Sequence, residues 1–490
     1  MKLSKSLTLL LGAAAMFAMY GCGSDNRESN IDQQSASYQA SADCIGCHAT
    51  NKTSPVTGAL IVEEWKKSAH NLRSGAACTD CHTNNGHPNG GTIVKAVQDT
   101  QCGTCHTAAS LGAAHFSPFA NLSAAQYVSQ VDPAGVQCRQ CHNPHDTTSL
   151  IQYNKDWAES GHGDVTFSDD GDASNNSVNS HYAWLVRNSC AKCHSTSGYK
   201  TVLAGGTPAV TYKKNEAIMC SACHSDYSWA RRAAGAQTLE YTYNSAAITL
   251  PDAGDSNLCL VCHSGRGNGQ SARSSRFAGH HAPTGADLFA EYTHLGYEFT
   301  GLDYTKKAYF KHDTIGMTDG SGPCVSCHMK AANSHTFEVA TKDANGVITA
   351  IKTKAVCDTC HTPGTQYEMT AAKLEEESAG YQEAGALLKA YLANTVTNYK
   401  SAAITYNSSA AVMPDNEYGA FQNSLLPGGD PGGYAHNRIY VKRLLFDSID
   451  FLDNGAFNGT ITFNAALTTA YPEAAVWFGA NATTGVATRP

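Results

Sequence analysis

The 490-residue chain has little positive charge, no long hydrophobic segment and almost no unpaired cysteine. Lysine and arginine number 34 against 42 aspartates and glutamates, so the formal net charge is −8. No basic patch is present that could neutralise phosphates, which argues against a nucleic-acid partner. The apolar run Leu7–Met19 is too short to span a membrane comfortably, and it follows two lysines. The sequence therefore predicts that residues 1–21 are a secretory leader.

Only one of the 19 cysteines lies outside a repeated motif, Cys-x-x-Cys-His. Because all the other cysteines form pairs of one spacing, a disulfide scaffold is excluded. A zinc protein would not require histidine after each pair, and a thioredoxin-like site is single. The nine copies of the motif are Cys44–His48, Cys78–His82, Cys102–His106, Cys138–His142, Cys190–His194, Cys220–His224, Cys259–His263, Cys324–His328 and Cys357–His361.

Nine such motifs predict nine covalently bound haem c groups. The two thiols of a motif add to the two vinyl groups of one porphyrin, and the adjacent histidine binds the iron as proximal ligand. The predicted attachment residues are Cys44, Cys47, Cys78, Cys81, Cys102, Cys105, Cys138, Cys141, Cys190, Cys193, Cys220, Cys223, Cys259, Cys262, Cys324, Cys327, Cys357 and Cys360. The predicted proximal ligands are His48, His82, His106, His142, His194, His224, His263, His328 and His361.

The chain is too short to give each of nine haems its own domain, so the haems must form much of the core themselves. The sequence therefore predicts a mainly irregular and α-helical multihaem cytochrome c. Short helices and loops would wrap a closely packed haem array, with little β-sheet. The 43 glycines fit a close approach of backbone to a flat ligand.

The spacing of the motifs predicts four regions after the leader. A soft stretch begins at residue 163, and its aspartates match no calcium-loop pattern, so we interpret it as a solvated loop. Two helices are expected near the C-terminus, Thr370–Leu392 and Arg438–Asp453, the second with Asn437 as N-cap. The regions are a lipidated N-terminus and polar tether (22–43), a four-haem region (44–162), a five-haem region (163–361) and a helical C-terminal region without haem motifs (362–490).

The unpaired cysteine, Cys22, directly follows the leader. Its setting resembles a bacterial lipoprotein cleavage site, although Met19 and Tyr20 replace the usual aliphatic and small residues. This predicts that Cys22 is lipidated and anchors the protein to a membrane. The alternative is ordinary cleavage nearby, which would leave an odd thiol in a secreted protein.

Twelve of the 21 histidines lie outside the motifs, enough for a second imidazole on every iron. Methionine ligation at Met219, Met317 or Met329 is the minor alternative, and it would raise the potential of that haem. The predicted distal ligands are His70, His115, His145, His162, His181, His281, His312, His335 and His436. The remaining three, His87, His280 and His294, are spares, and exchanges between neighbouring histidines stay open.

The local context of some distal candidates is informative. The segments Trp65–His70 and Trp157–His162 share the pattern W-x-x-S-x-H, which suggests a common structural role. His145 follows His142 by three residues and can hardly reach the same iron from the opposite face, so we expect it to serve a neighbouring haem. His436 precedes a helix signal and would tie the C-terminal region to the haem array.

These features resemble the multihaem outer-membrane c-type cytochromes of dissimilatory metal-reducing bacteria. The shared features are the lipoprotein leader, the dense CxxCH motifs, and phrases such as W-x-x-S-x-H and CAKCHSTSGY (190–199). The resemblance implies electron export to extracellular acceptors such as Fe(III) or Mn(IV) oxides, from a lipid-anchored position at the outer membrane or cell surface. It also implies other cytochromes or an outer-membrane porin–cytochrome conduit as partners.

Closely spaced bis-histidine haems favour an electron-transfer protein over an enzyme. The alternative is a multihaem reductase of nitrite, hydroxylamine or a sulfur oxyanion. Related reductases often carry lysine in place of the motif histidine at the catalytic haem. All nine motifs here end in histidine, which argues against that class.

Overall fold

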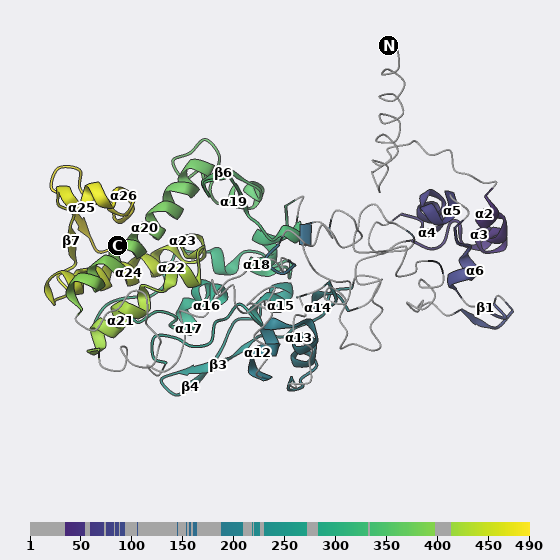
Figure 1. Cartoon of the computed structure of the whole chain (residues 1–490), viewed down its shortest axis with the longest axis horizontal. Coiled ribbons are helices and arrows are strands. Elements are labelled where there is room, and N and C mark those ends of the chain that lie inside the picture. Colours follow the sequence, from purple (N-terminus) through teal and green to yellow (C-terminus); the bar gives the residue numbers. More distant parts are fainter. Residues whose placement is uncertain are drawn as a thin grey trace, which may run out of the picture. The chain divides into compact units, whose positions relative to one another are not determined.

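The computed structural model of the protein consists of two compact units (Figure 1). Described residues up to Tyr153 belong to the first unit and those from Asp156 onward to the second. The residues that the structure describes are 35–53, 59–72, 75–82, 84–87, 89–93, 105, 145, 153, 156–157, 160–163, 188–208, 218, 220–225, 230–271, 283–331, 334–396 and 413–490.

The first unit is built from short helices around a small apolar cluster. Ile45, Val62 and Trp65 are its buried members, and Tyr38 packs against them. Helices α3 and α6 carry the first two motifs. The elements are α2 (Ala36–Ala40), α3 (Ala42–His48), α4 (Ile61–Lys67), α5 (Ala69–Leu72), α6 (Cys78–Cys81), β1 (Asn84–Asn85) and β2 (Thr92–Ile93).

The motif-bearing part of the second unit has the same character. Its helices are short, and its apolar clusters around Leu260 and Val261 are small. The elements are α12 (Asn188–His194), α13 (Thr196–Leu203), α14 (Cys220–Cys223), β3 (Thr238–Tyr243), β4 (Ala246–Thr249), η4 (Gly254–Ser256), α15 (Asn257–Leu260), α16 (Thr284–Leu288), α17 (Ala290–Thr293), η5 (His312–Thr314), α18 (Gly322–His328), η6 (Ser334–Thr336), β5 (Ala340–Lys342), β6 (Ile348–Ile351) and α19 (Lys354–Cys357).

The C-terminal part of the second unit contains the longest helices of the described chain. Helix α20 packs against α24 and α26, and α21 packs against α24 (Figure 1). The elements are α20 (Ala371–Thr395), α21 (Asp415–Asn423), α22 (Leu426–Gly429), α23 (Gly433–His436), α24 (Arg438–Asn454), β7 (Thr460–Thr462), α25 (Ala465–Ala470), α26 (Pro472–Phe478) and β8 (Val486–Thr488).

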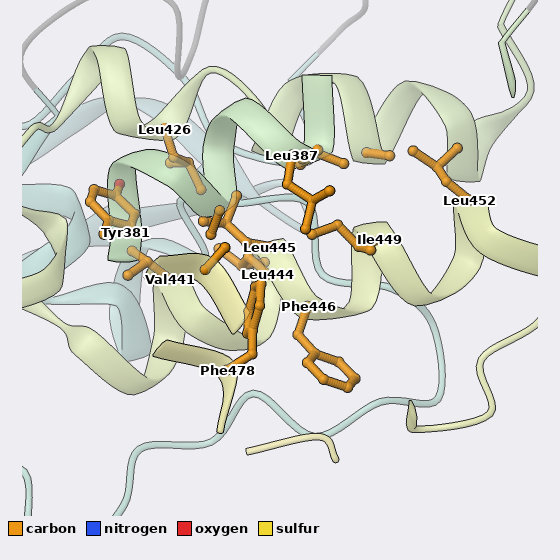
Figure 2. Packing of buried hydrophobic residues seen from close by; sticks show 14 of the residues in the cluster. Tyr381, Leu387, Leu426, Val441, Leu444, Leu445, Phe446, Ile449, Leu452 and Phe478 are labelled. Atoms are coloured by element: carbon orange, nitrogen blue, oxygen red, sulfur yellow. The ribbon is translucent and has the colours of Figure 1, made fainter. Parts of the chain in front are cut away.

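The largest apolar core of the described residues lies between these C-terminal helices. Figure 2 shows Leu387 of α20, Leu426 of α22 and Phe478 of α26 gathered around α24. Leu444 and Leu445 of α24 lie at its centre and are fully buried. Burial of each such side chain contributes roughly 1.5–3 kcal/mol, so this region forms a conventional protein core that the motif-bearing parts lack.

Both predicted C-terminal helices are confirmed, as α20 and α24. Helix α24 ends at Gly455, whose φ of 80° is the left-handed conformation that glycine adopts readily at a helix end. Asn437 occupies the N-cap position, but its side chain does not cap the helix; it donates to the Asp287 carbonyl at 3.2 Å instead. The prediction of a side-chain cap was therefore wrong, because a tertiary contact competes for the amide.

The polar residues of α24 are buried together with its apolar stripe. Asp447 is fully buried, accepts from Arg489 at 2.7 Å, and accepts from the Tyr304 hydroxyl at 2.6 Å. Arg443 is 2% exposed. The apolar residues of α24 form one stripe along the helix, but the structure buries nearly all sides of the helix.

The expectation of little β-sheet is confirmed. The described strands form four two-stranded antiparallel ribbons, β1–β2, β3–β4, β5–β6 and β7–β8. The described part of the chain is therefore mainly helical and irregular, as expected. Within the described part of the chain, no helix has the length and apolar character needed to cross a membrane. The predicted leader, residues 22–34 of the predicted tether and the soft stretch after residue 163 lie outside the described residues. The end of the tether is described and is helical: it contains α2 and the start of α3, and Ser37 is buried.

Lys442 provides a pH-dependent test of the C-terminal core. Its ammonium lies 5.3 Å from the centroid of the Trp477 ring, and burial lowers the pKa of Lys442 to about 8. Below this pH the folded protein holds a desolvated charge. We expect Lys442→Met to raise the free energy of unfolding at pH 7 by about 1–3 kcal/mol.

This gain in the free energy of unfolding should shrink as the pH rises from 8 towards 10.5. In that range the folded protein has lost the Lys442 proton and the unfolded chain still holds it, so the unsubstituted protein becomes more stable. Thermal unfolding of the unsubstituted protein and of Lys442→Met at pH 7 and pH 10 measures this difference in stability. Lys389 on α20 is exposed, and Lys389→Met is the control. An equal gain at both pH values would contradict the burial argument.

Candidate functional site

The described motifs share one local geometry. In each, the first cysteine lies one helical turn before the histidine, as shown by backbone hydrogen bonds such as His82 N to Cys78 O at 2.8 Å and His361 N to Cys357 O at 2.8 Å. One turn brings both thiols and the imidazole to the same side of the chain. We number the sites 1 to 9 in the order of their motifs; the structure describes the motifs of sites 1, 2, 5, 6, 7, 8 and 9, together with Cys105 of site 3.

Six motif histidines each face a second histidine from elsewhere in the sequence. The ring-centroid distances are 6.0 Å for His48 and His87, 6.0 Å for His82 and His145, 6.1 Å for His162 and His263, 6.4 Å for His224 and His335, 6.3 Å for His312 and His361, and 6.3 Å for His328 and His436.

This separation fits two imidazoles on opposite sides of one iron. A metal–imidazole bond of about 2.0–2.1 Å on each side places the ring centres about 6 Å apart. Rings in direct contact lie closer, as with Tyr243 and His294, whose centroids are 3.6 Å apart. Since each of the six pairs contains one motif histidine, the residues present fit a haem iron with two axial histidines.

The hydrogen bonds of the rings support the same interpretation. His328 Nδ1 bonds the Phe337 carbonyl at 2.6 Å, and His361 Nδ1 bonds the Tyr367 carbonyl at 2.9 Å. A ring that donates from Nδ1 to a carbonyl presents its Nε2 lone pair on the other side. The backbone thus selects the tautomer in which Nε2 is available to the iron.

Burial keeps several distal candidates neutral. It lowers the pKa of His162 to about 4. Burial, followed by the nearby His82 and His70 rings, lowers the pKa of His145 to about 4. Burial, with the His224 ring next, does the same for His335. At neutral pH these rings therefore carry a free lone pair, the state that metal binding requires.

His436 has a different environment from the other distal candidates. Its Nδ1 lies 2.9 and 2.8 Å from the two carboxylate oxygens of Asp430, which is 2% exposed. Burial acts to lower the pKa of His436, but the carboxylate outweighs it and the pKa is raised. Asp287, fully buried, adjoins Asp430, and burial with this neighbour raises the pKa of Asp287 well above its ordinary value. Asp287 therefore holds the proton of the acid pair, and Asp430 remains a carboxylate.

The two W-x-x-S-x-H segments form the same local structure, which confirms their common role. In both, the serine Oγ donates to the tryptophan carbonyl, at 2.7 and 2.6 Å. Trp65 Nε1 donates to the Ala76 carbonyl at 3.2 Å, and Trp157 Nε1 donates to the Ile218 carbonyl at 2.8 Å. Each acceptor lies two residues before a motif, at sites 2 and 6 respectively. The pattern therefore attaches a histidine-bearing segment to the start of a motif.

Attachment cysteines of different sites lie against one another. The thiols are close enough to shift each other's pKa at sites 1 and 2 through Cys44 and Cys78, at sites 5 and 7 through Cys193 and Cys262, and at sites 7 and 8 through Cys259 and Cys324. Cys327 and Cys357, of sites 8 and 9, are close enough to interact electrostatically. The sites are thus neighbours in space.

Close backbone packing explains the contact between sites 7 and 8. Gly254 and Gly322 have φ values of 56° and 70°, and a Cβ on either would lie 2.1 or 2.0 Å from a carbonyl oxygen of the facing segment. The Ser256 Oγ donates to the Ser321 carbonyl and accepts from the Val325 amide. Only glycine permits this approach, which brings α15 and α18 side by side.

The predicted site residues are distributed as follows. His145, His162, His312, His335 and His436 are paired with motif histidines, and so is His87, which the sequence interpretation counted as a spare. His294 bonds Glu298 at 3.1 Å. His70 lies near His145, and His194 is 5% exposed. Those outside the described residues stay predictions: Cys22, Cys102, Cys138, Cys141, His106, His115, His142, His181, His281 and the spare His280.

A sequence signal for His87 existed. His87, His145 and His335 each follow a motif closely, and each faces the histidine of an earlier motif. A histidine that closely follows one motif therefore pairs, in these three cases, with an earlier motif and not with the motif that it follows.

The sites define a multihaem c-type cytochrome with covalently bound haem c, and comparisons with known proteins agree. Residues 94–274 match the family model "Outer membrane cytochrome MtrC/MtrF-like, domains II/IV". The chain is 32% identical over 351 residues to the C-type polyheme cytochrome OmcB of Geobacter sulfurreducens, covering 58% of this chain and 46% of the relative. It is 33% identical over 384 residues to OmcC of the same species, covering 63% and 49%.

These matches are to multihaem outer-membrane c-type cytochromes, the family that the sequence features resemble. The chain spans about half the length of the curated relatives it matches. No solved structure matches it. Lipidation of Cys22 and the predicted region boundaries remain predictions.

Gly432 tests whether the position of the His436 ring matters. A Cβ at Gly432 would lie 2.6 Å from His436 Cε1, so Gly432→Ala must displace the ring. We expect one haem to become high-spin, or its reduction potential to shift, as measured by electron paramagnetic resonance and redox titration. Gly428, for which a Cβ would meet nothing within 4 Å, supplies the control Gly428→Ala. Identical spectra for the two variants would show that the ring's position has no influence on a haem.

Proposed function

We propose that this protein carries nine haem c groups with two axial histidines each, and that it transfers electrons between them towards extracellular acceptors. The observation that carries the proposal is the set of six histidine pairs at 6.0–6.4 Å, each with one motif histidine. The nine motifs and 21 histidines of the full chain supply enough ligands for all nine irons.

The pairs assign distal ligands to six sites. We propose His87 for site 1, His145 for site 2, His335 for site 6, His162 for site 7, His436 for site 8 and His312 for site 9. His87 is therefore proposed as a distal ligand, although the sequence alone had left it as a spare. For the remaining sites the candidates are His70, His115, His181, His280 and His281. His294 is left out, because it stacks on Tyr243 and bonds Glu298.

The contacts between attachment cysteines suggest an order of sites in the second unit. Cys193 contacts Cys262, and Cys259 contacts Cys324, which supports the order 5, 7 and 8. The proximity of Cys327 and Cys357 adds site 9. Cys223 of site 6 interacts with both cysteines of site 7, so site 6 lies beside this row.

The residues of the chain keep the sites ready for a one-electron change. Haem supplies the reversible ferric/ferrous couple. The Nδ1 bonds of His328 and His361 to backbone carbonyls hold both rings in position. Burial lowers the pKa of His162 and so keeps this ring neutral. Rings that keep their place in both oxidation states reduce the structural change that accompanies each electron.

The acceptors and partners follow from the resemblance to metal-reducing outer-membrane cytochromes. We propose Fe(III) or Mn(IV) oxides as extracellular acceptors, and other cytochromes or a porin–cytochrome conduit as electron donors. We further propose anchoring through lipidated Cys22. The reductase alternative requires an iron with an open coordination position, and the paired histidines of six sites favour electron transfer instead.

The assignment of His87 can be tested against His294. We expect His87→Ala to convert about one haem per protein to high-spin, with carbon monoxide binding to a similar extent after reduction. His294→Ala should leave the haem spectra unchanged, because the partners of His294 are Tyr243 and Glu298. Electron paramagnetic resonance of the oxidised proteins measures the first effect. A high-spin haem in the unsubstituted protein, with rapid nitrite turnover, would favour the reductase.

The haem number has its own test. The mass of the intact protein should exceed that of the mature polypeptide by nine haem masses plus any acyl groups. The colour should remain after denaturation and acetone extraction, since thioether bonds survive both. A mass corresponding to fewer haems would contradict the count of nine.

A further inference from the structure

Site 8 differs from sites 1 and 9 in the group that accepts the Nδ1 hydrogen bond of an axial histidine. At sites 1 and 9 the acceptor is neutral: the Ala435 carbonyl for His312 at 2.5 Å, the Tyr367 carbonyl for His361 at 2.9 Å, and the Asn51 amide oxygen for His48 at 3.1 Å. At site 8 the His436 Nδ1 bonds the carboxylate of Asp430 at 2.8 Å. One axial ligand therefore donates to an anion.

The protein holds this carboxylate rigidly and away from water. Asp430 is 2% exposed and lies between α22 and α23. Its Oδ1 accepts from the Thr284 hydroxyl at 3.2 Å and from the Gly432 amide at 3.3 Å. None of these groups is a lysine or arginine, and neither is His436 or the buried acid Asp287 beside it. The negative charge of Asp430 acts on both histidines of site 8, on His436 through a direct hydrogen bond and on His328 from further away.

A carboxylate in this position changes the ligand. It draws the Nδ1 proton towards itself, so the imidazole becomes a more basic and stronger donor through Nε2. A stronger donor stabilises the more positively charged, oxidised iron. The low local dielectric of a buried site increases this effect compared with the same pair in water.

We propose that Asp430 is a positioning residue that gives site 8 a lower reduction potential than sites 1 and 9. The proposal rests on the proposed function, in which His436 and His328 are the axial ligands of site 8. Site 8 lies between sites 7 and 9 in the order suggested by the cysteine contacts. Asp430 therefore controls how electrons distribute between site 7 on one side of site 8 and site 9 on the other.

The test compares two isosteric substitutions in the same buried cluster. Asp430→Asn removes the anionic acceptor while the size of the side chain stays the same. We expect one component of a spectroelectrochemical titration to move upward by about tenfold in its equilibrium constant, which is about 59 mV for one electron. Asp287→Asn changes the other buried acid of the cluster, which does not bond His436, and should leave that component nearly unchanged.

A third variant shifts the potential in the opposite direction. Thr284→Val removes one donor from Asp430, so more of the carboxylate's charge acts on His436, and the component that responds to Asp430→Asn should move downward. Because this change is small, it remains informative if Asp430→Asn does not fold. An upward shift with Thr284→Val, or equal shifts with Asp430→Asn and Asp287→Asn, overturns the proposal.

The spin states of the same samples separate this proposal from the proposed function. If all haems stay low-spin in Asp430→Asn and no component of the titration moves, Asp430 has no influence on the potential but the bis-histidine assignment stands. His436 is not a ligand if the unsubstituted protein already has a high-spin haem and His436→Ala changes neither this haem nor any other. The proposed function then fails at site 8 independently of Asp430.

Discussion

The separation between two imidazole rings that face one iron is the constraint on which the rest of this structure depends. Six pairs meet it within 6.0–6.4 Å, and their members come from distant parts of the sequence, as with His328 and His436. Holding such a distance requires that each ring be anchored at a second point. The chain provides these anchors through Nδ1 bonds, mostly to backbone carbonyls.

The C-terminal helices supply the rigidity that the motif-bearing parts lack. Around the motifs the apolar clusters are small, whereas α20, α24 and α26 enclose a large core. The short helix α23 connects this core to two sites at once: His436 faces His328, and the Ala435 carbonyl accepts from His312. A region without a single motif therefore positions ligands for both site 8 and site 9.

Close spacing of the sites has a cost in sequence choice. The approach of α15 to α18 needs glycine at 254 and 322, and the His436 ring lies so close to Gly432 that a methyl group would displace it. Burying Asp287 beside Asp430 is also unfavourable unless one acid keeps its proton. These unusual arrangements concentrate where two sites meet, which indicates that ligand geometry takes precedence over stability there.

The sequence by itself determined what is local: nine attachment motifs, the recurrent W-x-x-S-x-H segment, helices α20 and α24, and the class of the protein. Each depends on residues within one or a few helical turns, so spacing along the chain reveals them. Tertiary structure alone decided which histidine faces which motif, including His87, and which carboxylate meets His436. An axial pair joins residues whose separation in sequence is unrestricted, because the iron senses only their distance in space.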